Sequence, residues 1–223
     1  MKITLLCNCG LALESGGRTL LVDALTKPLA PFYHTPPAVR ADILNGAGAF
    51  KNICGMVFTH LHPDHFDREA AEEFSARHPN IPLYIPRRAI ATETLQAGDF
   101  SITCRRARHT KVEGYGKSTV ETLRIEAEGK RIYIASDCAP ESSIHEAILE
   151  GKVMDAAFWN PEALCLPEMW PLLTRCARQN FIYHIPPDGQ NGLCRKLARV
   201  MARGEDALSN VQLLSQYPSE IVL

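Results

Sequence analysis

The chain contains short apolar runs that alternate in the manner of β-strands, with turn residues between them. Strands are predicted at 2–7 (KITLLC) and 18–25 (RTLLVDAL), on either side of a turn at 16–17. Residues 118–137 are predicted to form a hairpin that turns at 128–130. Five further strands are predicted at 54–59, 81–86, 100–109, 153–160 and 180–185. The pattern therefore indicates a chain with many short strands.

Helical spacing of apolar residues appears between these strands. Ala70, Ala71 and Phe74 are placed for one face of a helix over 67–77, which Pro79 ends. Other helical segments are predicted over 87–96, 166–178 and 192–202, with one helical turn at 40–44 inside a surface loop from 28 to 48. Strands and helices alternate without internal repeats, which predicts a mixed α/β chain that forms a single domain over residues 1–223.

The composition is that of a folded globular protein. Of the 223 residues, 46% are apolar and 22% are charged, and the formal net charge is -1. This balance does not indicate a long nucleic acid or a membrane surface as partner, so a small-molecule substrate is expected. No apolar run reaches the roughly 18 residues that span a bilayer. The apolar stretch in MKITLLCNCG is too short for the core of a signal peptide, so export is not expected. We expect a cytoplasmic protein with eight reduced cysteines, and its oligomeric state is left open.

The stretch FTHLHPDHF, at 58–66, holds three of the eight histidines directly after an apolar run. His60 and His62 are two apart on extended backbone, so their rings lie on the same side and can bind one cation. Asp64 and His65 follow in the next turn, directed toward a second position. Three imidazoles and a carboxylate buried without partners would cost several kcal/mol. A metal site is therefore the better explanation of this stretch.

Three further side chains of metal-binding type end predicted strands, namely His109, Asp137 and His184. Strand ends are where a fold can direct side chains from separate segments to one point. A single zinc ion needs three or four ligands, whereas these three and the first four make seven. Seven ligands suffice for two divalent ions that share one carboxylate. We expect Zn²⁺, with Mn²⁺ and Fe²⁺ as alternatives for the same ligands.

The segment THLHPDH resembles the His-x-His-x-Asp-His signature of the metallo-β-lactamase superfamily of hydrolases. The later histidine, aspartate and histidine follow in the family's order, and the resemblance extends from about residue 2 to residue 190. It implies a four-layer αβ/βα sandwich with the site at one end, between two sheets. Alternating strands and helices alone would equally permit an open α/β sheet.

The resemblance also implies a dinuclear site with a structural aspartate behind it. One ion would be held by His60, His62 and His109, the other by Asp64, His65 and His184, and Asp137 would bridge the two. Asp23, at the end of TLLVD, matches the aspartate that supports the metal loop without binding metal.

Departures from the family pattern indicate which branch of the superfamily the chain resembles. The redox-active di-iron members have a Glu where this chain has His62, which disfavours oxygen chemistry. The glyoxalase branch follows its third histidine with Pro-Gly-His, whereas this chain has HTKVEGYGKST. The stretch GYGKSTVETLRIEAEGKRIYIASD is similar to the phosphodiesterase and tRNA-processing branch, although the basic arm of the tRNA-processing enzymes is not seen.

The resemblance implies hydrolysis by a metal-bridged hydroxide, with Asp64 orienting it and accepting its proton. The expected substrate is a small phosphodiester or phosphate-bearing ester. A lactone, carboxylic ester or thioester hydrolysed at the same site is an alternative. A metal-binding protein without catalysis is another, although a scaffold has no need of seven metal-binding residues.

Candidate substrate contacts lie in two loops. Lys111 and Lys117 follow the third metal-binding histidine and would attract a phosphate. His34, in PFYHTPP, would line the pocket. The basic run at 105–108 has two open explanations, since the same charges on an edge strand would prevent unwanted pairing. Cys138 is expected to be a buried neutral thiol, and His78 and His145 are expected to be structural. A structural role is also the favoured interpretation of His34, with the pocket contact as its alternative.

Overall fold

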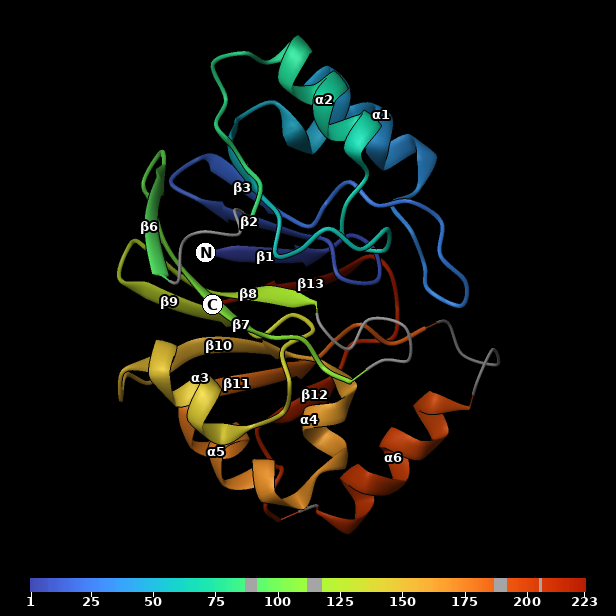
Figure 1. The fold of residues 1–223 in the computed structure, drawn as a ribbon, viewed down its shortest axis with the longest axis vertical. Coiled ribbons are helices and arrows are strands. Elements are labelled where there is room, and N and C mark those ends of the chain that lie inside the picture. The colour runs from blue at the N-terminus through green and yellow to red at the C-terminus, as the bar shows by residue number, and fades with distance from the viewer. Residues whose placement is uncertain (87–91, 112–117, 187–191, 205) are drawn as a thin grey trace.

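The computed structural model describes residues 1–86, 92–111, 118–186, 192–204 and 206–223, and these form two β-sheets packed face to face (Figure 1). The first sheet has six strands, in the order β13 (Ser219–Val222), β1 (Lys2–Leu5), β2 (Leu11–Ser15), β3 (Arg18–Val22), β4 (Ile53–Val57) and β5 (Leu83–Tyr84). The second has seven, in the order β12 (Val211–Leu213), β11 (Ala177–Ile182), β10 (Met154–Trp159), β9 (Lys130–Ile134), β8 (Thr119–Ala127), β7 (Phe100–Arg108) and β6 (Thr92–Ala97).

Helices cover the outer face of each sheet (Figure 1). The first sheet is covered by α1 (Pro37–Asn45) and α2 (Arg68–Arg77), with the 3-10 turn η1 (Gly48–Phe50) between them in the chain. The second is covered by α3 (Ser142–Leu149), α4 (Pro161–Cys165), η2 (Pro167–Met169), α5 (Trp170–Cys176) and α6 (Leu193–Arg203). This is the four-layer αβ/βα arrangement that the motif implied. Within the described residues, no helix combines the length and the apolar character needed to cross a bilayer.

The central core lies between the two sheets. Alternate residues of each strand point inward, so that Leu11 and Leu13 of one sheet share a buried cluster with Phe100, Ile102 and Phe158 of the other. Two separate buried clusters lie beneath the helices on either outer face. Because both faces of the sheets are covered, a strand such as β10 (MDAAFW) is nearly apolar throughout, as the sequence shows.

Several elements differ from those predicted from sequence. The elements α3, α4, β12 and β13 were not predicted, and α1 is longer than the single helical turn expected at 40–44. The strand β2 lies between the first two predicted strands and pairs with both neighbours. The helix predicted over 87–96 is wrong, because Thr92–Ala97 is strand β6, paired antiparallel with β7; residues 87–91 lie outside the described part. Backbone pairing with β7 and inward packing of Ala97 outweigh the weak helical spacing of this segment.

His145 of α3 is a structural histidine, as expected. The Tyr133 hydroxyl lies 2.6 Å from its Nδ1, and its Nε2 donates to the carbonyl oxygen of Ala139 at 3.1 Å. Burial lowers the pKa of His145 to about 4, so the folded chain keeps the ring neutral. His78 bonds through Nε2 to the carbonyl oxygen of Leu44 at 3.0 Å.

The low pKa of His145 predicts a loss of stability in mild acid. The unfolded chain protonates this ring near pH 6.5 and the folded chain only near pH 4, so the free energy of unfolding falls as the pH drops between these values. Urea unfolding gives the free energy of unfolding of the wild type and of His145→Asn at pH 7.5 and at pH 5. The advantage of the wild type over the variant should be about 2 kcal/mol smaller at pH 5 than at pH 7.5. A constant difference would contradict the prediction, since all other titrating groups cancel.

Candidate metal centre

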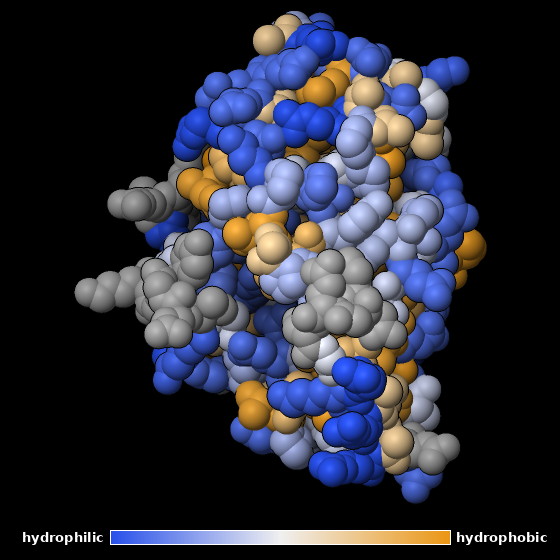
Figure 2. All heavy atoms as spheres, turned by 90° about the vertical axis from the view of Figure 1, so that its right-hand side faces the viewer, coloured by the Kyte–Doolittle hydropathy of each residue, from blue (hydrophilic) through white to orange (hydrophobic). Residues whose placement is uncertain are grey.

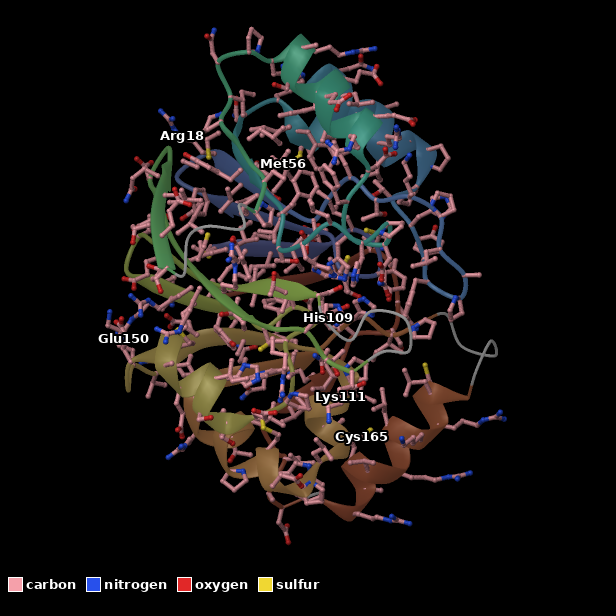
Figure 3. All side chains as sticks on the ribbon, in the orientation of Figure 1. Arg18, Met56, His109, Lys111, Glu150 and Cys165 are labelled. Atoms are coloured by element: carbon pink, nitrogen blue, oxygen red, sulfur yellow. The ribbon has the colours of Figure 1, made fainter. Side chains whose placement is uncertain are left out.

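The seven predicted ligands come from segments that end at one edge of the two sheets. His60, His62, Asp64 and His65 lie between β4 and α2, His109 follows β7, Asp137 follows β9, and His184 follows β11. Strands β9, β10 and β11 are parallel neighbours, so their carboxyl ends meet at the same edge. Figure 3 labels His109 at the boundary between the two sheets.

One cluster contains His60, His62, His109 and Asp137, whose ligand atoms all lie within 4.8 Å of one another. His60 Nε2 lies 3.1 Å from His62 Nδ1, and His109 Nε2 lies 3.4 Å from Asp137 Oδ2. Two nitrogens bound to the same tetrahedral zinc would be about 3.3 Å apart. The spacing of these donor atoms therefore suits a single small cation.

A second cluster contains Asp64, His65, His184 and the same Asp137. His184 Nε2 lies 3.0 Å from His65 Nε2 and 3.2 Å from Asp64 Oδ2. Asp137 reaches both clusters, because its Oδ2 is near His109 while its Oδ1 lies 3.5 Å from His184 Nε2. The two groups that the sequence assigned to two ions are thus adjacent and share one carboxylate.

In its neutral form, the ring of His109 is oriented to bind a cation in the first cluster. Its Nδ1–H donates to the carbonyl oxygen of Thr110 at 2.8 Å, which leaves the lone pair on Nε2. Nε2 is buried and has no hydrogen-bond partner. A buried nitrogen of this kind carries a desolvation cost that a metal ion would remove.

The charge states of Asp137 and His60 suit cation binding. Burial by itself would raise the pKa of Asp137, but His184 and the other surrounding imidazoles hold it well below its usual value. Burial, reinforced by neighbouring His65, lowers the pKa of His60 well below that of a free imidazole. The carboxylate is therefore ionised and the His60 ring is neutral, which are the forms that bind metal.

Asp23 supports the two clusters from behind. It accepts hydrogen bonds from the backbone N–H and hydroxyl of Thr59 at 2.8 and 2.7 Å, and its Oδ2 lies 2.9 Å from His65 Nδ1. Cys9 lies beside it and donates from Sγ to the carbonyl oxygen of Asp64 at 2.9 Å. The polar atoms of Asp23 and Cys9 are thus engaged within the protein. We interpret this buried group as support for the ligands.

Three residues at the site have left-handed backbone conformations that are costly without glycine. They are Asp23 (φ 46°), Ser136 (φ 50°) and His184 (φ 59°). The Ser136 hydroxyl lies 2.8 Å from that of Thr59, and the His184 N–H donates to the carbonyl oxygen of Asn8. These contacts stabilise the backbone conformation that directs Asp137 and His184 toward the two clusters.

A cavity of about 440 Å³ opens over both clusters. Five of the predicted ligands line it, namely His62, Asp64, His109, Asp137 and His184. Much of the remaining wall is apolar and includes Leu29, Phe32, Leu166 and Pro186. Its charged groups outside the clusters, within the described residues, are Glu162 and Lys196. Glu162 accepts a hydrogen bond from the hydroxyl of Thr110.

The structure places the predicted substrate contacts differently. Neither His34 nor Lys111 is among the described residues that line the cavity, and Lys117 lies outside the described residues. Sequence reasoning missed Lys196, because nothing in its helix distinguishes it from three nearby arginines. Cys138 is buried beside the site, and burial raises its pKa to about 12, so the thiol is neutral as expected.

No protein-family model and no curated protein matches the chain by sequence. Solved structures match it along almost its whole length. A possible metal-dependent hydrolase from Veillonella parvula is 16% identical with a TM-score of 0.69, and the match covers 100% of this chain and 99% of that one. The isothiocyanate hydrolase from Delia radicum gut bacteria is 14% identical, with a TM-score of 0.65 and the same coverage.

The metallo-β-lactamase fold protein YhfI from Bacillus subtilis is 15% identical, with a TM-score of 0.67 over 99% of this chain and 98% of that one. At such identities the likeness establishes the fold and not the activity. The layers, the strand order and this likeness together show that the chain has the metallo-β-lactamase fold, which confirms the resemblance found in THLHPDH.

Proposed function

We propose that the chain is a metal-dependent hydrolase of a small substrate. The observation that carries the proposal is the pair of ligand clusters that share Asp137 and line one cavity. Two of the structurally similar proteins support the general class, because one is named a possible metal-dependent hydrolase and the other an isothiocyanate hydrolase. The donor set is rich in imidazole and includes two carboxylates, which suits Zn²⁺, with Mn²⁺ or Fe²⁺ as alternatives.

In hydrolysis, the chain's own residues would bind the metal ions, orient the water and surround the substrate. Two bound divalent ions would lower the pKa of water toward about 7 and polarise the oxygen under attack. Asp64 lines the cavity. Burial by itself would raise its pKa, but the hydrogen bond from His184 and the charges of His65 and His184 together lower it, so Asp64 is ionised near neutral pH. Its carboxylate is placed to orient the attacking water and to accept its proton. The apolar wall would lower the effective dielectric around a bound substrate and so strengthen the electrostatic interactions there.

The preferred substrate class is a small phosphodiester or phosphate-bearing ester. A cavity of about 440 Å³ suits a small molecule, and Lys196 provides a cation in its wall. The apolar wall favours a second candidate, a lactone or carboxylic ester. Both classes would use the same clusters, so they differ only in the group that the cavity recognises.

A substrate panel tests the proposal. Protein reconstituted with Zn²⁺ or Mn²⁺ should hydrolyse bis(p-nitrophenyl) phosphate, an aryl carboxylic ester or a lactone, and the class with the highest kcat/KM identifies the preferred bond. Removing the metal with a chelator should lower the rate at least about 100-fold, and added Zn²⁺ should restore it. Protein that holds two equivalents of metal and is inert across the panel would instead be a metal-binding protein without catalysis.

A further inference from the structure

Lys196 is the one cation among the described residues that line the cavity. It lies in the first turn of α6, next to the cavity-lining Leu193, and its side chain is exposed. No described acidic residue forms an ion pair with it. Its ammonium group is therefore available to a molecule in the cavity.

The other cations of α6 serve as a comparison. Arg195, Arg199 and Arg203 are four residues apart, so they lie along one exposed stripe of the helix. Figure 2 shows the hydrophilic surface in the lower part of this face of the molecule. None of these arginines lines the cavity. Lys196 thus differs from its neighbours in position and not in charge.

The cavity combines three kinds of surface. The ligand clusters form its reactive part, and Phe32, whose ring lies 4.5 Å from that of His184, continues it as an apolar wall. Lys196 enters from a different element, α6, and adds one positive charge. The negative Glu162 is held by Thr110. A ligand that matches these surfaces has a hydrolysable group, an apolar segment and one anionic group.

We propose that Lys196 forms an anion subsite, so that the substrate carries a carboxylate or phosphate group separated by an apolar segment from the bond that is hydrolysed. The statement about the substrate rests on the proposed function. Anion binding by Lys196 does not, because it can be measured without turnover. A charge-assisted hydrogen bond from the ammonium to an anionic oxygen would supply the selectivity. The positive end of the α6 dipole adds to it.

Three ligands with the same three-carbon spacer test the subsite in the metal-loaded protein. Butyrate offers one carboxylate, glutarate adds a second, and 4-phosphonobutyrate adds a phosphonate. Calorimetric titration should show glutarate or 4-phosphonobutyrate binding about tenfold more tightly than butyrate. Whichever of the two shows the larger increase in affinity over butyrate indicates whether the substrate's anionic group is a carboxylate or a phosphate.

Matched variants assign the gain to Lys196. Lys196→Met should remove the preference for the dianionic ligands and leave butyrate binding unchanged, while Lys196→Arg should retain it. Arg199→Met, one turn further along the exposed stripe, should behave as the wild type. Equal binding of all three ligands by the wild type, or an equal loss for all three in Lys196→Met, would overturn the inference.

Kinetics separate this inference from the proposed function. With mono-p-nitrophenyl glutarate, Lys196→Met should raise KM about tenfold and change kcat less than about twofold, and with p-nitrophenyl butyrate neither should change. If the wild type hydrolyses neither ester nor any substrate of the panel, the proposed function fails. A Lys196-dependent preference in the calorimetric titration would then still support the anion subsite.

Discussion

Replacing Asp137 with alanine is expected to abolish hydrolysis and to reduce bound metal from two equivalents to fewer than one. Asp137 belongs to both ligand clusters. Its Oδ2 lies 3.4 Å from Nε2 of both His65 and His109, and its Oδ1 lies 3.5 Å from His184 Nε2. Without this buried anion, the surrounding imidazoles would have to hold two dications with Asp64 as the one remaining cluster carboxylate. We expect the rate to fall at least about 1000-fold.

Metal analysis by mass spectrometry and turnover on the best panel substrate measure this effect. Asp206→Ala, at an exposed position away from the cavity lining, is the matched control and should keep both metal and rate. His60→Ala and Asp64→Ala should also lose turnover and metal, each through one cluster. Two equivalents of metal and an unchanged rate in Asp137→Ala would remove the dinuclear proposal.

Replacing Asp23 with alanine is expected to weaken metal binding about 10- to 100-fold although Asp23 is assigned no metal. Its carboxylate orients His65 through Nδ1 and holds Thr59 through two hydrogen bonds. All three residues are fully buried, so the truncation leaves the Thr59 N–H and hydroxyl without their acceptor. We therefore also expect a loss of about 3 kcal/mol in the free energy of unfolding.

Chelator competition gives the metal affinity, and urea unfolding gives the stability. Asp23→Asn is the informative companion, because asparagine tolerates the left-handed backbone at this position and keeps one acceptor oxygen. It should retain most of the stability and lose part of the metal affinity. Wild-type metal affinity in Asp23→Ala would show that His65 is oriented without this carboxylate.

The metal-binding motif was readable because its chemistry is local. Four ligand-type side chains within six residues have no packing explanation, and the apolar run before them marks the end of a strand. His109 and His184 were found from position, as side chains of metal-binding type that end predicted strands. These patterns depend on side-chain period and burial, which a sequence carries directly.

Other features depended on contacts between distant segments. Strand β6 has little apolar alternation of its own, and its state follows from hydrogen bonding to β7. Lys196 lines the cavity because α6 packs against α4, with Leu197, its one fully buried residue within the described part, in the cluster beneath the helices of the second sheet. Lys111 follows the ligand His109 by two residues and still does not line the cavity.

By itself, the sequence determined which residues have metal-binding chemistry and where strands end, because both are properties of single residues and their neighbours. The family resemblance already implied that Asp137 joins both clusters, whereas the tertiary structure alone decided that Lys196, and not Lys111, supplies the cation of the described cavity wall. The physical reason is that proximity between segments more than a hundred residues apart arises from sheet pairing and core packing. Those interactions are distributed over the whole chain and leave no mark at the residues they bring together.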